Sequence, residues 1–132
     1  MLIAGLDHFV LTVADLDETI AFYVRAIGLE HIRFGEGRHA LKCGQQKINL
    51  HPATDPIHPH AAFPTPGAAD LCLLVNGRLE EAIERLEQAK VAVELGPIER
   101  TGSQGPIRSI YVRDPDQNLI ELAEQQPSTS SG

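Results

Sequence analysis

The chain has 132 residues, of which 42% are apolar and 22% are charged, as is typical of a soluble globular protein with one hydrophobic core. Its formal net charge of −7 argues against nucleic acid and anionic membranes as partners. No apolar run approaches the roughly 18 residues of a membrane span. Residues 1–4 also lack the basic start of a signal peptide, so we expect a cytoplasmic protein.

The first part of the chain predicts a strand over residues 4–13, followed by a helix. Asp15 stands three residues before Glu18, which is the spacing of a helix-capping pair. An apolar stripe at helical spacing follows and runs up to Gly28, a residue type that often ends helices. The stripe consists of Leu16, Ile20, Tyr23 and Ile27. Three short strands are predicted after it, near residues 29–35, 38–43 and 46–51.

Residues 52–67 form a predicted linker, because they contain five prolines and show no periodicity. Two histidines in this stretch, His58 and His60, are expected to be exposed to solvent, and the alternative is that the linker crosses the cleft and brings one of them in. We assign no role to His31 and His39.

Beyond the linker, the same pattern of elements is repeated. Residues 70–75 predict a strand, and an apolar stripe of Leu79, Ile83 and Leu86 predicts a helix. Residues 91–98 predict a further strand. The glycine-containing segment 102–106 that follows is interpreted either as a lid or as a plain exposed loop.

The segment 107–122 predicts two strands around a forced turn. Ile110 and Val112 alternate with polar residues, and Pro115 then interrupts the strand because it has no amide donor. The second strand places Glu121 between apolar neighbours. A buried carboxylate must be paired, protonated or bound to a metal, whereas a half-exposed one is simply solvated, and both interpretations remain open here.

Each half of the chain therefore has the order β-α-β-β-β. The sequence predicts an α+β fold in which two βαβββ modules form a curved mixed sheet with a central cleft and outer helices. We expect one domain over 1–132, made of module one (4–51), the linker (52–67) and module two (68–125).

Both cysteines, Cys43 and Cys72, lie alone in predicted apolar strands. They do not have the CxxC spacing of a metal or redox site. We expect buried reduced thiols, and a disulfide is the less favoured alternative.

Two motifs make the chain resemble the vicinal oxygen chelate superfamily, which includes glyoxalase I, fosfomycin-resistance proteins, extradiol dioxygenases and bleomycin-binding proteins. One is Asp7-His8-Phe-Val-Leu-Thr-Val with the helix end at Gly28, and the other is the segment from Ser109 to Leu122. The stretch 45–51, together with glycines and prolines between residues 96 and 106, also resembles the glyoxalase-domain-containing-5 group.

In this superfamily, the first and last strands of each module supply metal ligands. The resemblance implies four ligand positions: His8, Asn49, Asp70 and Glu121. Two of them depart from the usual pattern, because glyoxalase I has glutamate at the second position and histidine is common at the third. His51 lies two residues beyond Asn49 and is the alternative ligand, while Asp70 is alternatively a strand cap. The set is rich in oxygen and suits Zn, Ni, Co, Mn or Fe as a divalent ion, without identifying which.

The resemblance also implies substrate-binding residues. Ser109 and Tyr111 match residues that touch the substrate in fosfomycin-type relatives. Arg100 and Arg108 flank the segment 102–106 and are candidates to hold a carboxylate or phosphonate of the substrate. Arg113 stands beside Asp114 and is interpreted as a structural ion pair or a binding residue.

The function that follows is a glyoxalase-like, metal-dependent lyase or isomerase acting on a small oxygenated metabolite, with Glu121 as the catalytic residue that moves the proton. Extradiol dioxygenase and standard fosfomycin transferase chemistry are disfavoured because position 70 is not histidine. The alternative is a non-catalytic small-molecule-binding protein, for sequestration or resistance. The absence of Trp, with two Tyr and four Phe, argues against stacking a large drug. We also expect a homodimer, in which the linker permits swapped or unswapped modules.

Overall fold

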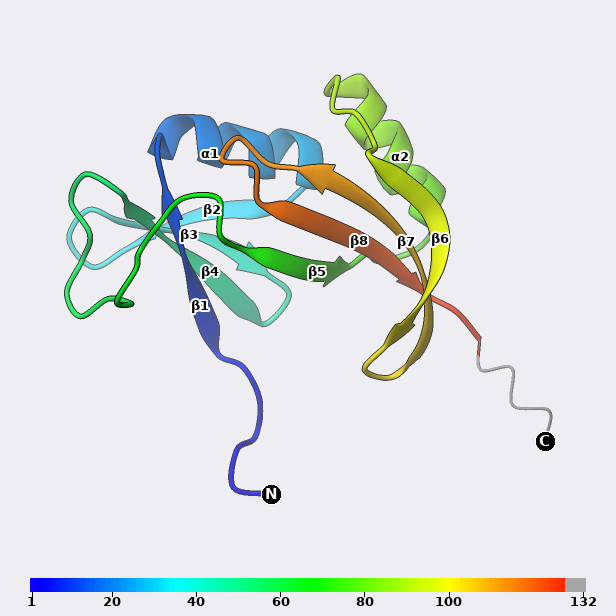
Figure 1. The fold of residues 1–132 in the computed structure, drawn as a ribbon, viewed down its shortest axis with the longest axis horizontal. Coiled ribbons are helices and arrows are strands. Elements are labelled where there is room, and N and C mark those ends of the chain that lie inside the picture. The colour runs from blue at the N-terminus through cyan, green and yellow to red at the C-terminus, as the bar shows by residue number, and fades with distance from the viewer. Residues whose placement is uncertain (128–132) are drawn as a thin grey trace. The chain divides into compact units, whose positions relative to one another are not determined.

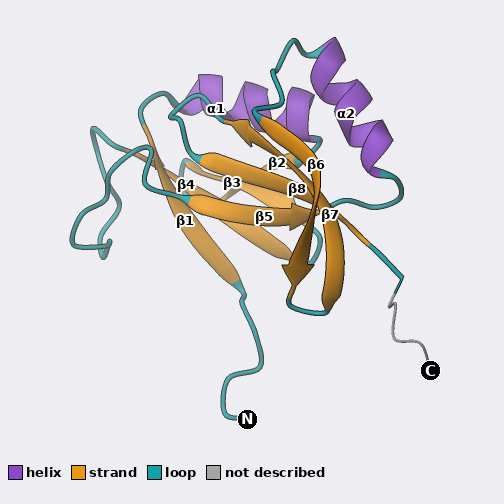
Figure 2. Cartoon of the chain, turned by 45° about the vertical axis from the view of Figure 1, so that its right-hand side comes forward, coloured by secondary structure: helices purple, strands orange, loops and turns teal. Residues whose placement is uncertain are grey.

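The computed structural model describes residues 1–127. Contacts divide the chain into two units, which are described separately. Unit 1 comprises residues 1–69 and 115–118, and unit 2 comprises residues 70–114 and the chain from Leu119 onward. In chain order the elements are β1 (His8–Val13), α1 (Leu16–Phe22), a π-helical turn (Tyr23–Ile27), β2 (Glu30–Phe34), β3 (Arg38–Cys43), β4 (Gln46–Pro52), β5 (Asp70–Leu74), α2 (Leu79–Gln88), β6 (Leu95–Gly102), β7 (Gly105–Arg113) and β8 (Leu119–Gln125) (Figures 1 and 2).

Unit 1 is a four-stranded mixed sheet with the order β1-β4-β3-β2. The pair β1–β4 is parallel and the other pairs are antiparallel. Apolar side chains alternate along β1 and β4, so that Leu11 and Leu50 lie on one face and are almost fully buried. This apolar face packs against α1, whose buried side includes Thr19. The opposite face carries the polar residues of unit 1 that concern function.

Helix α1 begins where the sequence predicts. Asp15 is its N-cap, and one carboxylate oxygen of Asp15 accepts a hydrogen bond from the Glu18 backbone N–H at 2.9 Å. After Phe22 the helix widens into the π-helical turn, and the Gly28 and Leu29 N–H groups both donate to the Tyr23 carbonyl. Gly28 has a φ of 89°, a left-handed conformation that favours glycine.

We expect Asp15→Ala to lower the free energy of unfolding by about 1 kcal/mol, because an N-cap side chain that satisfies a helix N–H is typically worth about that much. Urea denaturation measures the change. Asp55→Ala removes the same charge from an exposed turn and should leave the unfolding free energy almost unchanged. Equal effects of the two substitutions would mean that the Asp15 cap contributes nothing beyond its charge.

Unit 2 repeats this topology, with the sheet order β5-β8-β7-β6 and a parallel β5–β8 pair. Its most apolar face is formed by residues such as Ile110, Ile120 and Leu122, which are at most 3% exposed. Helix α2 contacts β8 and contributes the buried Leu79 and Leu86. The prediction of an α+β fold with two βαβββ modules is therefore confirmed at the level of two four-stranded mixed sheets and two helices.

Two strand boundaries differ from the sequence prediction. The first strand begins at His8 and not at residue 4. Strand β6 covers Leu95–Gly102, whereas residues 91–98 were predicted. Gly102 pairs with Gly105, so that segment 102–106 is part of an antiparallel hairpin with Ser103 and Gln104 at its tip. In the described part of the chain, no helix is long and apolar enough to cross a membrane.

Candidate functional site

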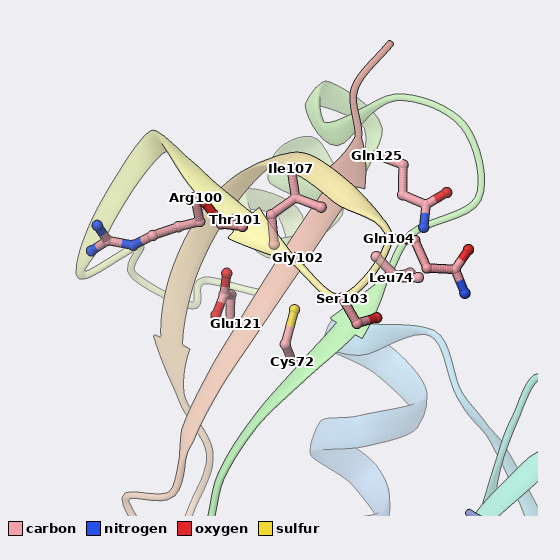
Figure 3. A pocket seen from close by; sticks show the side chains of 10 residues that line it. All are labelled: Cys72, Leu74, Arg100, Thr101, Gly102, Ser103, Gln104, Ile107, Glu121 and Gln125. Atoms are coloured by element: carbon pink, nitrogen blue, oxygen red, sulfur yellow. The ribbon is translucent and has the colours of Figure 1, made fainter. Parts of the chain in front are cut away.

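Unit 2 contains a cavity of about 440 Å³ beneath the β6–β7 hairpin (Figure 3). It lies on the face of the sheet opposite α2, because Cys72 and Glu121 alternate with the buried apolar residues of their strands. Residues from β5, β6, β7, β8 and the hairpin tip line it: Cys72, Leu74, Arg100, Thr101, Gly102, Ser103, Gln104, Ile107, Glu121 and Gln125.

Glu121 is half-buried in β8 and has Cys72 of β5 and Tyr111 of β7 as its cross-strand neighbours. Figure 3 shows the Glu121 carboxylate and the Cys72 thiol side by side, both pointing toward the hairpin. Partial burial of the thiol raises the pKa of Cys72 to about 11, with smaller contributions from the Glu121 charge and from a hydrogen bond to Glu121. The Cys72 thiol is therefore protonated at pH 7 and can donate to the Glu121 carboxylate beside it.

The cysteines are free thiols, as expected, but only in part buried. Cys43 is half-buried and Cys72 is exposed, so the prediction that both thiols are buried is wrong for Cys72. The alternation of β5 explains the difference, because Leu71 and Leu73 occupy the opposite face of the strand and leave Cys72 on the cavity side.

Arg100 reaches the cavity from β6. Its Nε donates a hydrogen bond to the Tyr111 hydroxyl at 3.0 Å, and its guanidinium carbon lies 5.7 Å from the centre of the Tyr111 ring. Within the described residues the terminal nitrogens of Arg100 make no hydrogen bond. Tyr111 thus orients the Arg100 guanidinium, and the two terminal amino groups of Arg100 remain available to an anionic oxygen.

Three further residues predicted from the sequence lie near this face. Ser109 is fully buried on β7, and its hydroxyl oxygen has no hydrogen-bond partner among the described residues. Asp70 is exposed at the start of β5. Arg113 donates to the Glu94 carboxylate at 2.9 Å, so Glu94 is an ion-pair partner of Arg113. The pKa of Arg113 is raised, mainly by this hydrogen bond and to a smaller extent by the Asp70 charge.

Arg108 lies on the other face of the sheet, toward α2. Its terminal nitrogen donates to the Glu80 carboxylate at 2.6 Å and to that of Glu124 at 3.3 Å. Glu124 in turn accepts the backbone N–H of Leu79 at 2.8 Å, and this bond chiefly holds the pKa of Glu124 below its ordinary value. Arg108 is therefore engaged in fixing the start of α2, and we do not include it in the proposed site.

Unit 1 carries the other predicted metal ligands on its polar face. His8 is exposed, and its Nδ1 lies 2.8 Å from a carboxylate oxygen of Asp7, while its Nε2 has no partner among residues 1–127. A carboxylate that holds the remote nitrogen is a common arrangement around metal-binding histidines. Asn49 is 4% exposed, and its side-chain oxygen has no hydrogen-bond partner within the described chain.

His51 lies on the same face, two residues beyond Asn49, and lines a second cavity of about 500 Å³. His60, from the proline-rich segment, also lines this cavity. His58 and His60 are both exposed, as expected, and their ring centres are 4.6 Å apart. The segment has no periodicity from which the sequence could have predicted which of the two histidines lines the cavity.

The donor chemistry of the predicted ligands fits a divalent cation, because it combines one imidazole, one amide oxygen left without a partner and two carboxylates. His8 and Asn49 belong to unit 1, and Asp70 and Glu121 belong to unit 2. Over residues 1–127, no group of three or more His, Cys, Asp and Glu side chains is placed to hold a metal. The metal site accordingly stays a prediction.

Residues 5–122 match the model of the glyoxalase/bleomycin resistance protein/dioxygenase superfamily. The chain belongs to this superfamily. The match covers both modules, from the strand that carries His8 to the strand that carries Glu121, so the resemblance stated from the sequence is confirmed.

Among members of the superfamily, the chain is 48% identical to the glyoxalase domain-containing protein RDO1 of Mycosarcoma maydis, over 94% of this chain and 70% of that protein. The crystal structure of virulence protein STM3117 from Salmonella typhimurium has a TM-score of 0.92 at 44% identity, covering 96% of this chain and 100% of the other. A more distant structure is a mutant of FosX, the genomically encoded fosfomycin resistance protein of Listeria monocytogenes, in complex with Mn(II) and 1S,2S-dihydroxypropylphosphonic acid. It has a TM-score of 0.62 at 27% identity and covers 92% of this chain and 90% of the other.

Proposed function

We propose that the chain is a metal-dependent lyase or isomerase of glyoxalase type that moves a proton on a small oxygenated substrate. The observation that carries the proposal is that Glu121 and Arg100 both line the cavity of unit 2. A base and an anion-binding group in one cavity are what proton abstraction beside a carboxylate or carbonyl requires.

In this proposal each side chain of the cavity has a defined task. Glu121 accepts the proton from the substrate carbon and returns it, with its cross-strand neighbour Cys72 as a candidate to orient the carboxylate. Arg100, held by the Tyr111 hydroxyl, binds an anionic oxygen of the substrate. The Ser109 hydroxyl, buried without a partner, is a second candidate to bind the substrate.

We further propose that His8, Asn49, Asp70 and Glu121 hold a divalent ion, which would be Zn, Ni, Co, Mn or Fe. Such an ion would stabilise negative charge that develops on substrate oxygens. The Mn(II) bound by the FosX mutant supports a metal of this kind in the superfamily. The Asp7 carboxylate beside His8 and the unpartnered Asn49 oxygen support the two unit 1 positions.

The register of unit 1 favours Asn49 over His51 as the ligand that accompanies His8. His8 is opposite Lys47 in the parallel β1–β4 pair, Asn49 is opposite Val10, and His51 is opposite Thr12. At about 3.3 Å per residue, Asn49 lies roughly 7 Å along the strand from His8 and His51 roughly 13 Å. A separation of roughly 13 Å along the strand is too long for His8 and His51 to bind the same ion.

We therefore expect Asn49→Ala to weaken metal binding by a factor of about 10–100, the range found when a group that supports a metal centre is removed. His51→Ala should leave the affinity within about threefold of wild type, since the proposed ion does not touch it. Isothermal titration with Mn²⁺ and Zn²⁺ measures both variants. The opposite ranking would make His51 the ligand, and two equally small effects would exclude a ligand from this strand.

A non-catalytic binding protein for small molecules is the second candidate. The specific observation in its favour is that no three acidic, cysteine or histidine side chains are grouped to hold a metal in residues 1–127. A cavity can bind an oxygenated ligand through Arg100 without transforming it.

Metal analysis of protein purified without added metal, and then after loading with each candidate ion, tests the proposal. One equivalent of metal per chain, lost in His8→Ala, together with turnover on a panel of small hydroxy- and oxo-compounds, is the expected result. Absence of metal under every loading condition would leave only the binding function.

We also propose a homodimer, located in the cytoplasm. The edge strands of each sheet, such as β1 and β2 in unit 1, leave backbone groups on their outer sides that a second copy can pair with. We expect analytical ultracentrifugation at micromolar concentration to show about twice the 14.4 kDa mass of the chain. Sedimentation as a single 14.4 kDa species would contradict the dimer.

A further inference from the structure

The cavity of unit 1 contains a buried histidine without a partner. His51 is 5% exposed, and neither of its ring nitrogens has a hydrogen-bond partner in the described chain. Both nitrogens of an imidazole normally make hydrogen bonds when the ring is buried, so an orphaned ring that lines a cavity indicates a missing ligand group. Because the register of β1 and β4 favours Asn49 as the ligand that accompanies His8, the His51 ring is not a ligand in the proposed metal site.

The two ring nitrogens of His51 can take different hydrogen-bonding roles. An imidazole that carries one proton has one N–H donor and one nitrogen acceptor. The His51 ring can therefore donate one hydrogen bond to a ligand and accept another from it. A hydroxyl group can take part in both bonds.

The walls of the cavity carry no Lys, Arg, Asp or Glu side chain. They are formed mainly by apolar residues, with one hydroxyl and one further imidazole: Val10, Thr12, Pro59, His60, Ala61 and Pro64. Arg38 does not line the cavity, and its guanidinium carbon stands 4.7 Å from the centre of the Phe34 ring. An ion bound here would therefore lack a charged side chain to pair with, whereas hydrocarbon would be buried favourably.

Thr12 and His60 extend the polar part of the cavity on either side of His51. Thr12 is the cross-strand partner of His51 in the β1–β4 pair, so its hydroxyl is on the same face. The Nδ1 of His60 lies 2.8 Å from the Ala61 carbonyl oxygen, which holds the ring and leaves Nε2 facing away from that bond. Three polar side chains therefore line the cavity, and each of them can donate or accept a hydrogen bond.

We propose that this cavity is a binding site for an uncharged, mainly hydrocarbon small molecule with a hydroxyl or carbonyl group, which His51 recognises. The site lies wholly in unit 1 and shares no residue with the Glu121 cavity. It does not depend on the proposed metal chemistry and can be tested without it.

The test uses the full chain and cyclohexanol as the probe, with cyclohexanecarboxylate and Zn²⁺ as comparison ligands. Proton–nitrogen correlation spectra of the histidine rings report directly on His51. Cyclohexanol is expected to shift the His51 ring signals with saturation, and cyclohexanecarboxylate is expected to bind at least tenfold more weakly. His51→Phe should weaken cyclohexanol binding at least tenfold, and His51→Gln, which keeps a donor and an acceptor, should recover part of it.

His58→Ala is the matched control, because His58 is an exposed histidine of the proline-rich segment that does not line the cavity. It should leave the affinity unchanged. Circular dichroism and thermal melting of each variant establish that the variants are folded, and the ring shifts in the wild-type chain do not depend on any variant.

Three outcomes would overturn the proposal. They are no shift of the His51 ring with cyclohexanol, tighter binding of the carboxylate than of the alcohol, and stoichiometric Zn²⁺ binding that perturbs both His51 and His60. The last outcome would make the cavity a cation site. The two proposals can fail separately. If cyclohexanol does not bind, the measured metal content and turnover still stand, and if the chain shows no turnover, the cyclohexanol binding still stands.

Discussion

Glu121→Gln is expected to abolish nearly all turnover while the chain remains folded. A neutral amide cannot accept a proton from carbon, and general acid–base catalysis is typically worth about 10²–10⁴ in rate. The same substitution removes one negative charge from the proposed ligand set, so we expect metal affinity to fall by a factor on the order of 100. Steady-state kinetics on whichever substrate the wild-type chain turns over, together with titration of the metal, measure the two losses.

Glu87→Gln provides the control, because Glu87 is an exposed residue of α2 and the change is chemically identical. Its rate and metal affinity should equal those of wild type. A Glu121→Gln variant that keeps both metal and turnover would remove Glu121 from the site. Loss of turnover with full metal affinity would instead mean that Glu121 moves the proton without ligating the ion.

Gly96→Ala is expected to lower the free energy of unfolding by about 3–5 kcal/mol, the largest stability effect we predict. Gly96 has a φ of 108°, a conformation that costs roughly 1–3 kcal/mol for a residue with a side chain. An added Cβ would also collide with the Ser109 carbonyl oxygen and approach the Ile110 Cα to 2.9 Å. Because these are backbone atoms of β7, relief requires the two strands to separate, which adds a cost of overpacking of about 1–3 kcal/mol.

Gly105→Ala separates the two contributions. Gly105 has a φ of 121°, but a Cβ there would meet nothing within 4 Å. Its cost should be that of backbone strain alone, about 1–2 kcal/mol. Urea denaturation of both variants gives the difference, and equal losses would show that β7 accommodates the Gly96 side chain without cost.

The sequence predicted most of the fold because both the alternation of apolar residues in strands and their helical spacing in helices are strong in this chain. The alternation on either side of Pro115 and the capping residue Asp15 both agree with the structure. The π-helical turn could not be predicted, because the stripe was extended at ordinary helical spacing to Ile27. In the widened turn Ala26 is 3% exposed and Ile27 is only half-buried.

Strand β6 was displaced for a different physical reason. Val91 and Val93 suggested a strand, whereas Thr101 and Gly102 did not. Antiparallel pairing depends on backbone groups, and the β7 backbone continues far enough to pair with both Thr101 and Gly102. Pairing therefore extends over residues with little preference for strands.

The candidate site was predicted unevenly. Glu121 and Arg100 line one cavity, as side chains for a common substrate would. Arg108 was placed with them only because it flanks the same segment, and the alternation of β7 turns it toward Glu80 instead. The position of Cys72 in this cavity was not predicted, because an isolated cysteine gives no signal until its cross-strand neighbour is known.

The turn at residues 115–118 has a consequence for any attempt to cut this chain into its two repeats. The turn lies in the second half of the sequence, yet its contacts assign it to unit 1. There, the Asp116 carboxylate accepts the Ala14 N–H at 3.3 Å, and Asn118 accepts the Ala69 N–H at 2.8 Å. A fragment ending at residue 69 would leave both N–H groups without these acceptors. The structural unit therefore does not coincide with the sequence repeat, and a boundary at residue 69 would remove the turn that unit 1 takes from the second half of the chain.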